Sequence, residues 1–137
     1  MSIPVNSGVI DTTTPELTGI DIYMGIGGAP EGVLAAAALR CIGGQIQARL
    51  HPLSDADYKR AELIGVKDIK RKFTTIDLAS GDVFFSATGV TDGSLLSGVK
   101  FKRGSIETET VVMRSATKTV RWIKTKHGFP GGGHGLG

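Results

Sequence analysis

The sequence, 137 residues long, predicts one α/β domain in which helices pack on a mixed β-sheet. Three observations predict this fold. Strand-prone and helix-prone segments follow one another in the order β-α-β-α-α-β, and three further strand-prone stretches come after them. One of the predicted helices is apolar almost all round, which is typical of a buried helix. The composition, 40% apolar and 21% charged, is that of a globular protein with a hydrophobic core.

The first predicted strand covers residues 19–24 and leads through a glycine-rich turn into a helix over residues 30–42. Pro30 suits the first helical position because its missing N–H would have no intrahelical partner there. Glu31 puts a negative charge in the first turn, where the helix dipole favours it. Such a turn can bind phosphate and a carboxylate beside it can hold a cation, although many such turns only begin a helix.

Local signals predict the remaining elements. A second strand is expected at residues 45–50. Ser54 as N-cap, with Asp57 at the third helical position, predicts a helix that a later glycine ends. A short helix is expected at residues 75–79, and the apolar run 82–88 predicts a strand covered on both faces. Three more strands complete the sheet, at residues 98–103, 106–115 and 119–124.

The bulk properties limit the location and the partners of this chain. No apolar stretch reaches the ~18 to 20 residues that a membrane span needs, so we expect no membrane partner. The first residues lack the basic and apolar regions of a secretory signal. The single cysteine, Cys41, excludes an internal disulfide and fits a reducing compartment. We therefore expect a cytoplasmic protein with a buried, unreactive thiol.

The net charge is +3, and basic residues outnumber acidic ones between residues 100 and 126. This excess suits nucleic acid, phosphorylated metabolites, or simply the solvated face of strands. Basic residues surround Phe101 and Trp122, a pattern found in strands that bind nucleic acid. Because aromatic residues make up only 6% of the chain, we expect these two side chains in the core and no nucleic-acid partner.

Catalytic and metal-binding motifs reduce to one candidate pair of carboxylates. The three histidines, His51, His127 and His134, lack the spacing of a metal site, and the chain has neither a P-loop nor a nucleophile elbow. Glu31 and Asp92 both follow predicted strands, and ligands gather at the carboxyl ends of strands in open α/β sheets. Two carboxylates are few for a two-metal site, so the catalytic residues stay unknown from the residues alone.

A long motif over residues 25–44 resembles a signature of the class II fructose-1,6-bisphosphatases. It contains Gly-Gly-Ala-Pro-Glu-Gly followed by an alanine-rich helix and a closing glycine pair. That family includes the bifunctional fructose-1,6-/sedoheptulose-1,7-bisphosphatases and belongs to the lithium-sensitive sugar and inositol phosphatase superfamily. The resemblance covers about residues 19–127. Further matching motifs lie at residues 47–50, 87–93, 96–99 and 108–115.

The resemblance implies a phosphatase of carbohydrate metabolism that removes the 1-phosphate of fructose 1,6-bisphosphate with Mn²⁺ or Mg²⁺. In the family the glutamate of Gly-Ala-Pro-Glu is a metal ligand, which implies that role for Glu31. A glycine of the same motif contacts substrate, which implies that role for Gly28. The implied mechanism is in-line attack by metal-activated water. The implied fold is the C-terminal domain of the inositol monophosphatase-like superfamily.

Family members are more than twice as long as this chain, and their other metal-binding carboxylates and substrate-gripping segments lie in an N-terminal half. We therefore expect a flexible N-terminal segment at residues 1–18, the family's C-terminal domain at residues 19–127, and a flexible glycine-rich tail at residues 128–137. We expect the chain alone to be inactive. A missing N-terminal half, or a homo-oligomer partner, would complete its site for a sugar bisphosphate.

Two alternatives stay open at this point. One is a non-catalytic module that binds a sugar phosphate or another anion. The other is a structural or partner-binding domain, in which the helix at residues 30–42 is partly bare and the chain self-associates.

Overall fold

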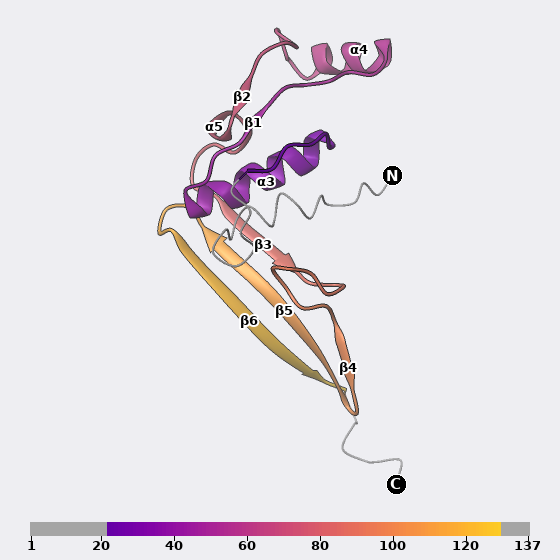
Figure 1. The fold of residues 1–137 in the computed structure, drawn as a ribbon, viewed down its shortest axis with the longest axis vertical. Helices are drawn as coiled ribbons and strands as arrows, with labels where there is room; N and C mark the ends of the chain where they lie inside the picture. Colours follow the sequence, from indigo (N-terminus) through magenta and orange to yellow (C-terminus); the bar gives the residue numbers. More distant parts are fainter. Residues whose placement is uncertain (1–21, 130–137) are drawn as a thin grey trace.

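Three helices and six strands make up residues 22–129, which are the residues that the computed structural model describes (Figure 1). The predicted N-terminal segment, residues 1–18, and nearly all of the tail predicted at residues 128–137 lie outside this range. The long strands lie at one end of the molecule, α4 lies at the other, and α3 lies between them. In chain order the elements are α3 (Ala29–Ile42), β1 (Gln47–Ala48), α4 (Asp55–Leu63), β2 (Phe73–Thr74), α5 (Thr75–Leu78), β3 (Phe84–Thr88), β4 (Lys100–Lys102), β5 (Ser105–Arg114) and β6 (Thr119–Gly128).

The larger sheet is built around β5. This strand pairs with β6 along its whole length on one side, and on the other side with β4 near its start and β3 near its end. Threonine and valine favour the extended backbone of β5 because their branched side chains suit a pleated surface. Side chains alternate between the two faces of a strand, so Val111 and Met113 share the face that packs against α3.

Every strand pairing among the described residues is antiparallel, so the prediction of a mixed sheet is wrong for this part of the chain. Residues 22–24 form no strand, and the segment predicted at residues 45–50 shortens to β1, which pairs with β2. The helices and strands themselves agree with the predicted α/β class.

Helix α3 is buried in its C-terminal half and exposed in its N-terminal half. Pro30 lies in the first turn and Gly43 forms a left-handed C-cap with φ 86°, as predicted. Cys41 is fully buried, whereas Val33 and Leu34 are 44% and 49% exposed. The prediction of a helix buried all round is therefore wrong for the first half, because the sheet meets α3 only towards its C-terminal end.

One face of β3 is open. Phe85 is buried against α3, but its neighbour Phe84 is 66% exposed and lies beside the guanidinium of Arg114. The predicted cover on both faces is wrong, because no described element packs on the outer side. Phe101 and Trp122 are exposed as well, which corrects the prediction that they belong to the core.

Side-chain caps hold the two smaller helices. The Ser54 hydroxyl accepts a hydrogen bond from the Asp57 N–H at 3.3 Å, which confirms the predicted start of α4. A reciprocal capping box between Thr74 and Asp77 begins α5. The Thr75 hydroxyl accepts a hydrogen bond from the Ile46 N–H at 2.8 Å and so ties α5 to the segment that follows α3.

The hydrophobic core lies where α3 meets β3 and β5. Alanines on α3 let the helix approach the sheet closely, and the larger core side chains come from the strands and the loop after β3. No helix in residues 22–129 is both long enough and apolar enough to span a membrane. The buried members of the core are Ala38, Cys41, Phe85, Leu96, Val111 and Met113.

Candidate functional site

The glycine-rich turn ends at Gly28, the N-cap of α3. Gly28 has an extended backbone, and its carbonyl accepts the first intrahelical hydrogen bond from the Gly32 N–H at 3.1 Å. A glycine offers no side-chain oxygen, and no side chain of the described residues caps the N–H groups of the first turn. The N-terminal end of α3 therefore presents backbone donors directly beside Gly28.

Glu31 lies in this first turn, as predicted, and one of its carboxylate oxygens is buried without a partner. Its Oε2 atom has no hydrogen bond within the described residues. Leaving a buried polar atom unpaired costs roughly 1–3 kcal/mol, and more when the group is charged. A cation bound to that oxygen would remove this cost. The geometry of Glu31 thus fits the role of a metal ligand.

Asp92, the second carboxylate of the predicted pair, does not join Glu31. It lies in the loop after β3, where its Oδ1 accepts a hydrogen bond from the Gly98 N–H at 2.8 Å. Figure 1 shows α3 and β3 diverging from the region where they touch, so that the first turn of α3 and the loop after β3 lie apart. Asp92 closes its own loop, and the predicted pairing of the two carboxylates is wrong.

No complete metal centre is present within residues 22–129, where no three His, Cys, Asp or Glu side chains come close enough to share an ion. His51 is exposed in the loop before α4. The ring of His127 bonds the Thr108 hydroxyl at 3.2 Å on the larger sheet, and His134 lies outside the described residues. The described part of the chain therefore supplies one candidate ligand, Glu31, and not a full set.

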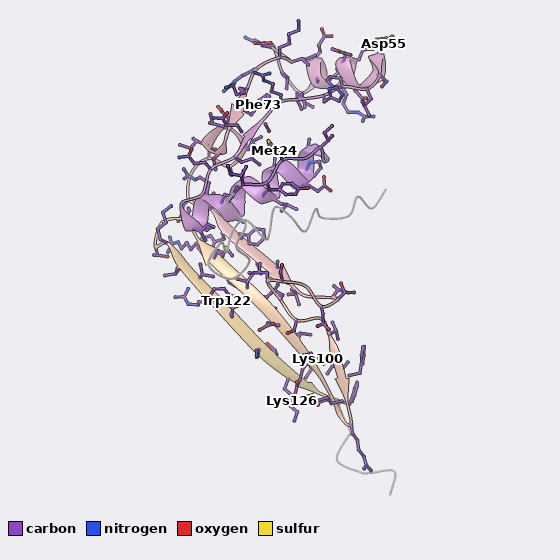
Figure 2. All side chains as sticks on the ribbon, in the orientation of Figure 1. Met24, Asp55, Phe73, Lys100, Trp122 and Lys126 are labelled. Carbon is purple, nitrogen blue, oxygen red and sulfur yellow. The ribbon has the colours of Figure 1, made fainter. Side chains whose placement is uncertain are left out.

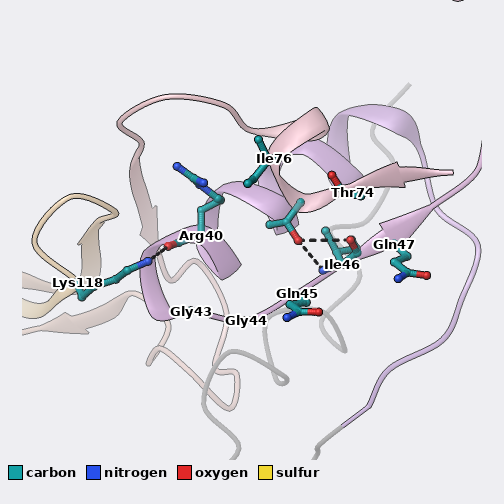
Figure 3. A pocket seen from close by; sticks show the side chains of 10 residues that line it. Arg40, Gly43, Gly44, Gln45, Ile46, Gln47, Thr74, Ile76 and Lys118 are labelled. Carbon is teal, nitrogen blue, oxygen red and sulfur yellow. Dashed lines mark hydrogen bonds between the residues drawn. The ribbon is translucent and has the colours of Figure 1, made fainter.

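The C-terminal end of α3 is closely partnered by the rest of the chain. The Cys41 thiol donates to the Val83 carbonyl at 3.6 Å, and burial raises the pKa of this thiol. Cys41 is thus a buried side chain with little thiolate, as predicted. The Lys118 ammonium donates to the Arg40 carbonyl at 2.7 Å, so a cation lies at the negative end of the helix dipole (Figure 3).

The proximity of Arg40 and Lys118 was not predicted from the sequence. They are 78 positions apart and line the same pocket, whose volume is about 450 Å³. Lys118 has a left-handed backbone, with φ 54°, which is uncommon for a residue other than glycine. The sequence signals are weak: Arg40 follows the helical pattern, and Lys118 falls in a predicted turn.

The basic stretch after residue 100 is partly neutralised by carboxylates on the same sheet. Lys102 forms an ion pair with Glu107 at 2.7 Å, and Lys124 lies 3.8 Å from Glu109. The hydrogen bond from Lys102 is the main reason that the pKa of Glu107 is lowered. These pairs favour the interpretation of the stretch as a solvated sheet face.

The two exposed aromatic residues do not form one stacking surface. Phe101 pairs with Ile106 and Trp122 pairs with Val111, and these two β5 residues point to opposite faces of the sheet. Figure 2 shows Trp122 nearer to α3, whereas Lys126 lies towards the far end of the sheet. A nucleic-acid strand would need its aromatic and basic side chains on one face.

Residues 6–127 match the family described as bacterial fructose-1,6-bisphosphatase, glpX-encoded. Three similar proteins share the name D-fructose 1,6-bisphosphatase class 2/sedoheptulose 1,7-bisphosphatase. The protein of Synechococcus strain JA-2-3B'a(2-13) is 46% identical over 123 residues, which cover 80% of this chain and 35% of the relative. That of Synechococcus strain JA-3-3Ab is 42% identical with the same coverage. That of Crocosphaera subtropica is 39% identical and covers 80% and 36%.

The chain spans about a third of the length of the curated relatives it matches. The matched range includes the glycine-rich turn, α3 and nearly all of the larger sheet. Both Gly28 and Glu31 lie within the matched range, as do Arg40 and Lys118 of the 450 Å³ pocket.

Proposed function

We propose, because this chain belongs to the family of bacterial, glpX-encoded fructose-1,6-bisphosphatases, that the N-terminal end of α3 forms part of a site that hydrolyses a sugar bisphosphate. The proposed reaction releases the 1-phosphate of fructose 1,6-bisphosphate. Sedoheptulose 1,7-bisphosphate is a second substrate named for the relatives. The proposal places the fold in the lithium-sensitive sugar and inositol phosphatase superfamily, and the protein in cytoplasmic carbohydrate metabolism.

The observation that carries this proposal is the buried Glu31 Oε2, which has no hydrogen-bond partner in the described part of the chain. In this proposal, Glu31 holds Mn²⁺ or Mg²⁺, because hard divalent cations prefer carboxylate oxygens. Gly28 lets a sugar phosphate approach the backbone because it has no Cβ. The N–H groups of the first turn orient the phosphate, and the positive end of the helix dipole favours its charge.

Residues 22–129 hold no group of three or more His, Cys, Asp or Glu side chains that could bind an ion without further ligands. A divalent cation, when bound, would polarise the phosphoryl group and lower the pKa of a bound water. We propose that the chain alone is inactive, and that a further polypeptide segment or a second copy supplies the other carboxylates. Glu31 and Gly28 are then this chain's contribution to a shared site.

A chimera tests the proposal in a complete enzyme. Residues 22–127 of this chain replace the matching third of the Synechococcus relative, and Mn²⁺-dependent phosphate release from fructose 1,6-bisphosphate is measured. We expect activity in the chimera and a loss of about 100-fold or more in its Glu31→Gln variant, since even outer-shell changes cost 10–100-fold. Glu62→Gln, which makes the same charge change on an exposed face of α4, should keep full activity.

Two further measurements separate the possible failures. Mn²⁺ binding by electron paramagnetic resonance should weaken in the Glu31→Gln chimera even if that variant turns over slowly. Phosphate release by the chain alone should be absent. Full activity in the Glu31→Gln chimera would refute the role of Glu31, and activity in the isolated chain would refute the shared site.

A partner-binding domain is the second candidate function, because an apolar surface is bare at the same end of α3. In this case the chimera would assemble and bind its other part, but Glu31→Gln would change neither metal binding nor activity. The exposed apolar side chains before and within the first half of α3 are Ile22, Met24, Ile26, Val33 and Leu34.

A further inference from the structure

A pocket of about 450 Å³ lies at the C-terminal end of α3, the end away from Glu31 (Figure 3). The turn after the helix forms one wall, and the β2–α5 segment forms another. Pockets of roughly 300–1,000 Å³ are the usual size for small-molecule sites. Helix α3 has 14 residues and is ~21 Å long, so this pocket is separate from the proposed metal site.

The charge of the pocket is positive and has no counter-ion in the described structure. Arg40 and Lys118 line it, and none of the described residues that line it is acidic. Both cations are held by neutral carbonyls: Arg40 Nη2 donates to the Gly81 oxygen at 2.7 Å, and Lys118 donates to the Arg40 oxygen at 2.7 Å. The neighbouring carboxylate of Asp82 accepts hydrogen bonds from Arg114 instead, at 2.7 Å and 3.2 Å.

One donor at this site is unsatisfied. Arg40 Nε is buried and has no hydrogen-bond acceptor within the described residues. Buried donors in native proteins are nearly always paired, so an unpaired one calls for an explanation. An anion in the pocket would lie beside the guanidinium of Arg40, and a small turn of this side chain would aim the fork of N–H groups at it.

We propose that this pocket binds a phosphate group carried on a small organic molecule, a phosphate monoester. Arg40 and Lys118 would neutralise the phosphate, because two cations without a protein counter-ion match a dianion. The amides of Gln45 and Gln47 and the hydroxyl of Thr74 add neutral hydrogen-bonding groups to the lining. Ile46 and Ile76 provide the apolar surface that an organic group covers and that inorganic phosphate does not.

Nuclear magnetic resonance on the ¹⁵N-labelled chain tests this site directly. Phenyl phosphate and inorganic phosphate are titrated separately at constant ionic strength, with chloride as the control anion. We expect saturable shifts of the backbone amides of Gly43, Gly44 and Gln45, and tighter binding of phenyl phosphate. Equal affinity for both probes would overturn the monoester and leave a site for free phosphate only.

Variants of the two cations give the sharper result. Arg40→Gln and Lys118→Gln should each weaken binding about tenfold, whereas Lys118→Arg should retain most of it. Lys59→Gln removes a charge from the exposed face of α4 and should change nothing. Spectra without phosphate show whether each variant keeps the fold. If Lys118→Gln unfolds the chain, Arg40→Gln and Lys118→Arg still test the site.

Three outcomes would overturn the inference: shifts equal to those caused by chloride, shifts confined to Gly28 and Gly32, or unchanged affinity in both Gln variants. The proposed phosphatase function is tested separately, since its readout is Mn²⁺-dependent turnover and the Glu31→Gln variant. Glu31→Gln should leave phenyl phosphate binding at this pocket unchanged.

Discussion

The two ends of α3 differ in how far the described chain completes them. At the C-terminal end, Cys41 is buried in the core, Gly43 closes the helix, and a lysine from a distant turn bonds the Arg40 carbonyl. At the N-terminal end, Val33 and Leu34 remain about half exposed, and a buried oxygen of Glu31 has no partner within residues 22–129. Within the described residues, α3 is thus packed and capped at its C-terminal end, whereas its N-terminal end is partly exposed and carries an unpaired carboxylate oxygen.

The residues that stabilise the fold and the residues proposed to bind a ligand therefore lie at opposite ends of α3. Residues that pack against β3 and β5 stabilise the fold from within the chain. Residues at the start of α3 gain little from burial, and the proposed function places metal and phosphate binding there. Substitutions at the C-terminal end should therefore mainly change stability, whereas substitutions at the N-terminal end should mainly change ligand binding.

The largest effect on stability is expected at the core under the C-terminal half. Met113 is 1% exposed, so Met113→Ala should lower the free energy of unfolding by about 2–5 kcal/mol. Leu34→Ala, at the exposed half, should cost less than about 0.5 kcal/mol. Urea unfolding followed by circular dichroism measures both. A similar cost for the two variants would mean that Leu34 is buried in solution, and repeating the measurement at high dilution would show whether a second copy covers it.

Two glycines of α3 should respond with opposite signs. Gly43 has φ 86°, so Gly43→Ala forces an L-residue into the left-handed region and should cost about 1–2 kcal/mol. Gly32 lies inside the helix, and an added Cβ there meets nothing within 4 Å. Gly32→Ala should stabilise the chain by roughly 0.5–1 kcal/mol. Thermal and urea unfolding of both variants check the signs, and a loss at Gly32 would show that this end is not a free helix start.

The smallest expected effect is a pH dependence of stability that comes from Asp82, which lies near the C-terminal end of α3. The hydrogen bond from Arg114 is the main reason that the pKa of Asp82 is lowered, with further bonds from Ser115 and Ala116. Because the folded pKa lies below the unfolded one, Asp82 stabilises the fold above its unfolded pKa. That contribution is lost as the pH falls through the folded pKa.

Asp82→Asn should therefore lower stability at neutral pH and flatten the loss of stability in acid. The measurement is the free energy of unfolding against pH, and Glu62→Gln on α4 is the charge-matched control. A parallel pH profile in Asp82→Asn and its parent would contradict the assignment.

Local signals in the sequence predicted the parts of the fold that local contacts decide. Ser54 and Asp57 are three residues apart and cap their helix as expected, and Pro30 and Gly43 mark the bounds of α3 within one residue. The antiparallel pairing of β1 with β2 depends on residues far apart, and the pattern of one strand does not select its partner. The prediction of a mixed sheet failed for this reason.

In the candidate site, too, the sequence predicted what local contacts decide and not what long-range contacts decide. Glu31 was predicted from its place in a helix turn and from the resemblance of its motif, and its position in that turn is confirmed. Its role as a metal ligand stays a prediction. The meeting of Arg40 and Lys118 was not predictable, since it depends on how the β5–β6 turn folds back over the end of α3. Asp92 looked like a ligand from its loop, but its oxygen bonds the backbone of Gly98.

The burial of Cys41 makes its thiol a natural probe of local opening of the fold. Reagents that label thiols reach this side chain only after α3 lifts away from β3, because the sulfur is completely covered and bonds the Val83 carbonyl. As the chain has one cysteine, each labelling event reports the opening of the same contact. The rate of thiol labelling in native buffer therefore measures how often the contact between the C-terminal half of α3 and β3 opens, without any engineered probe.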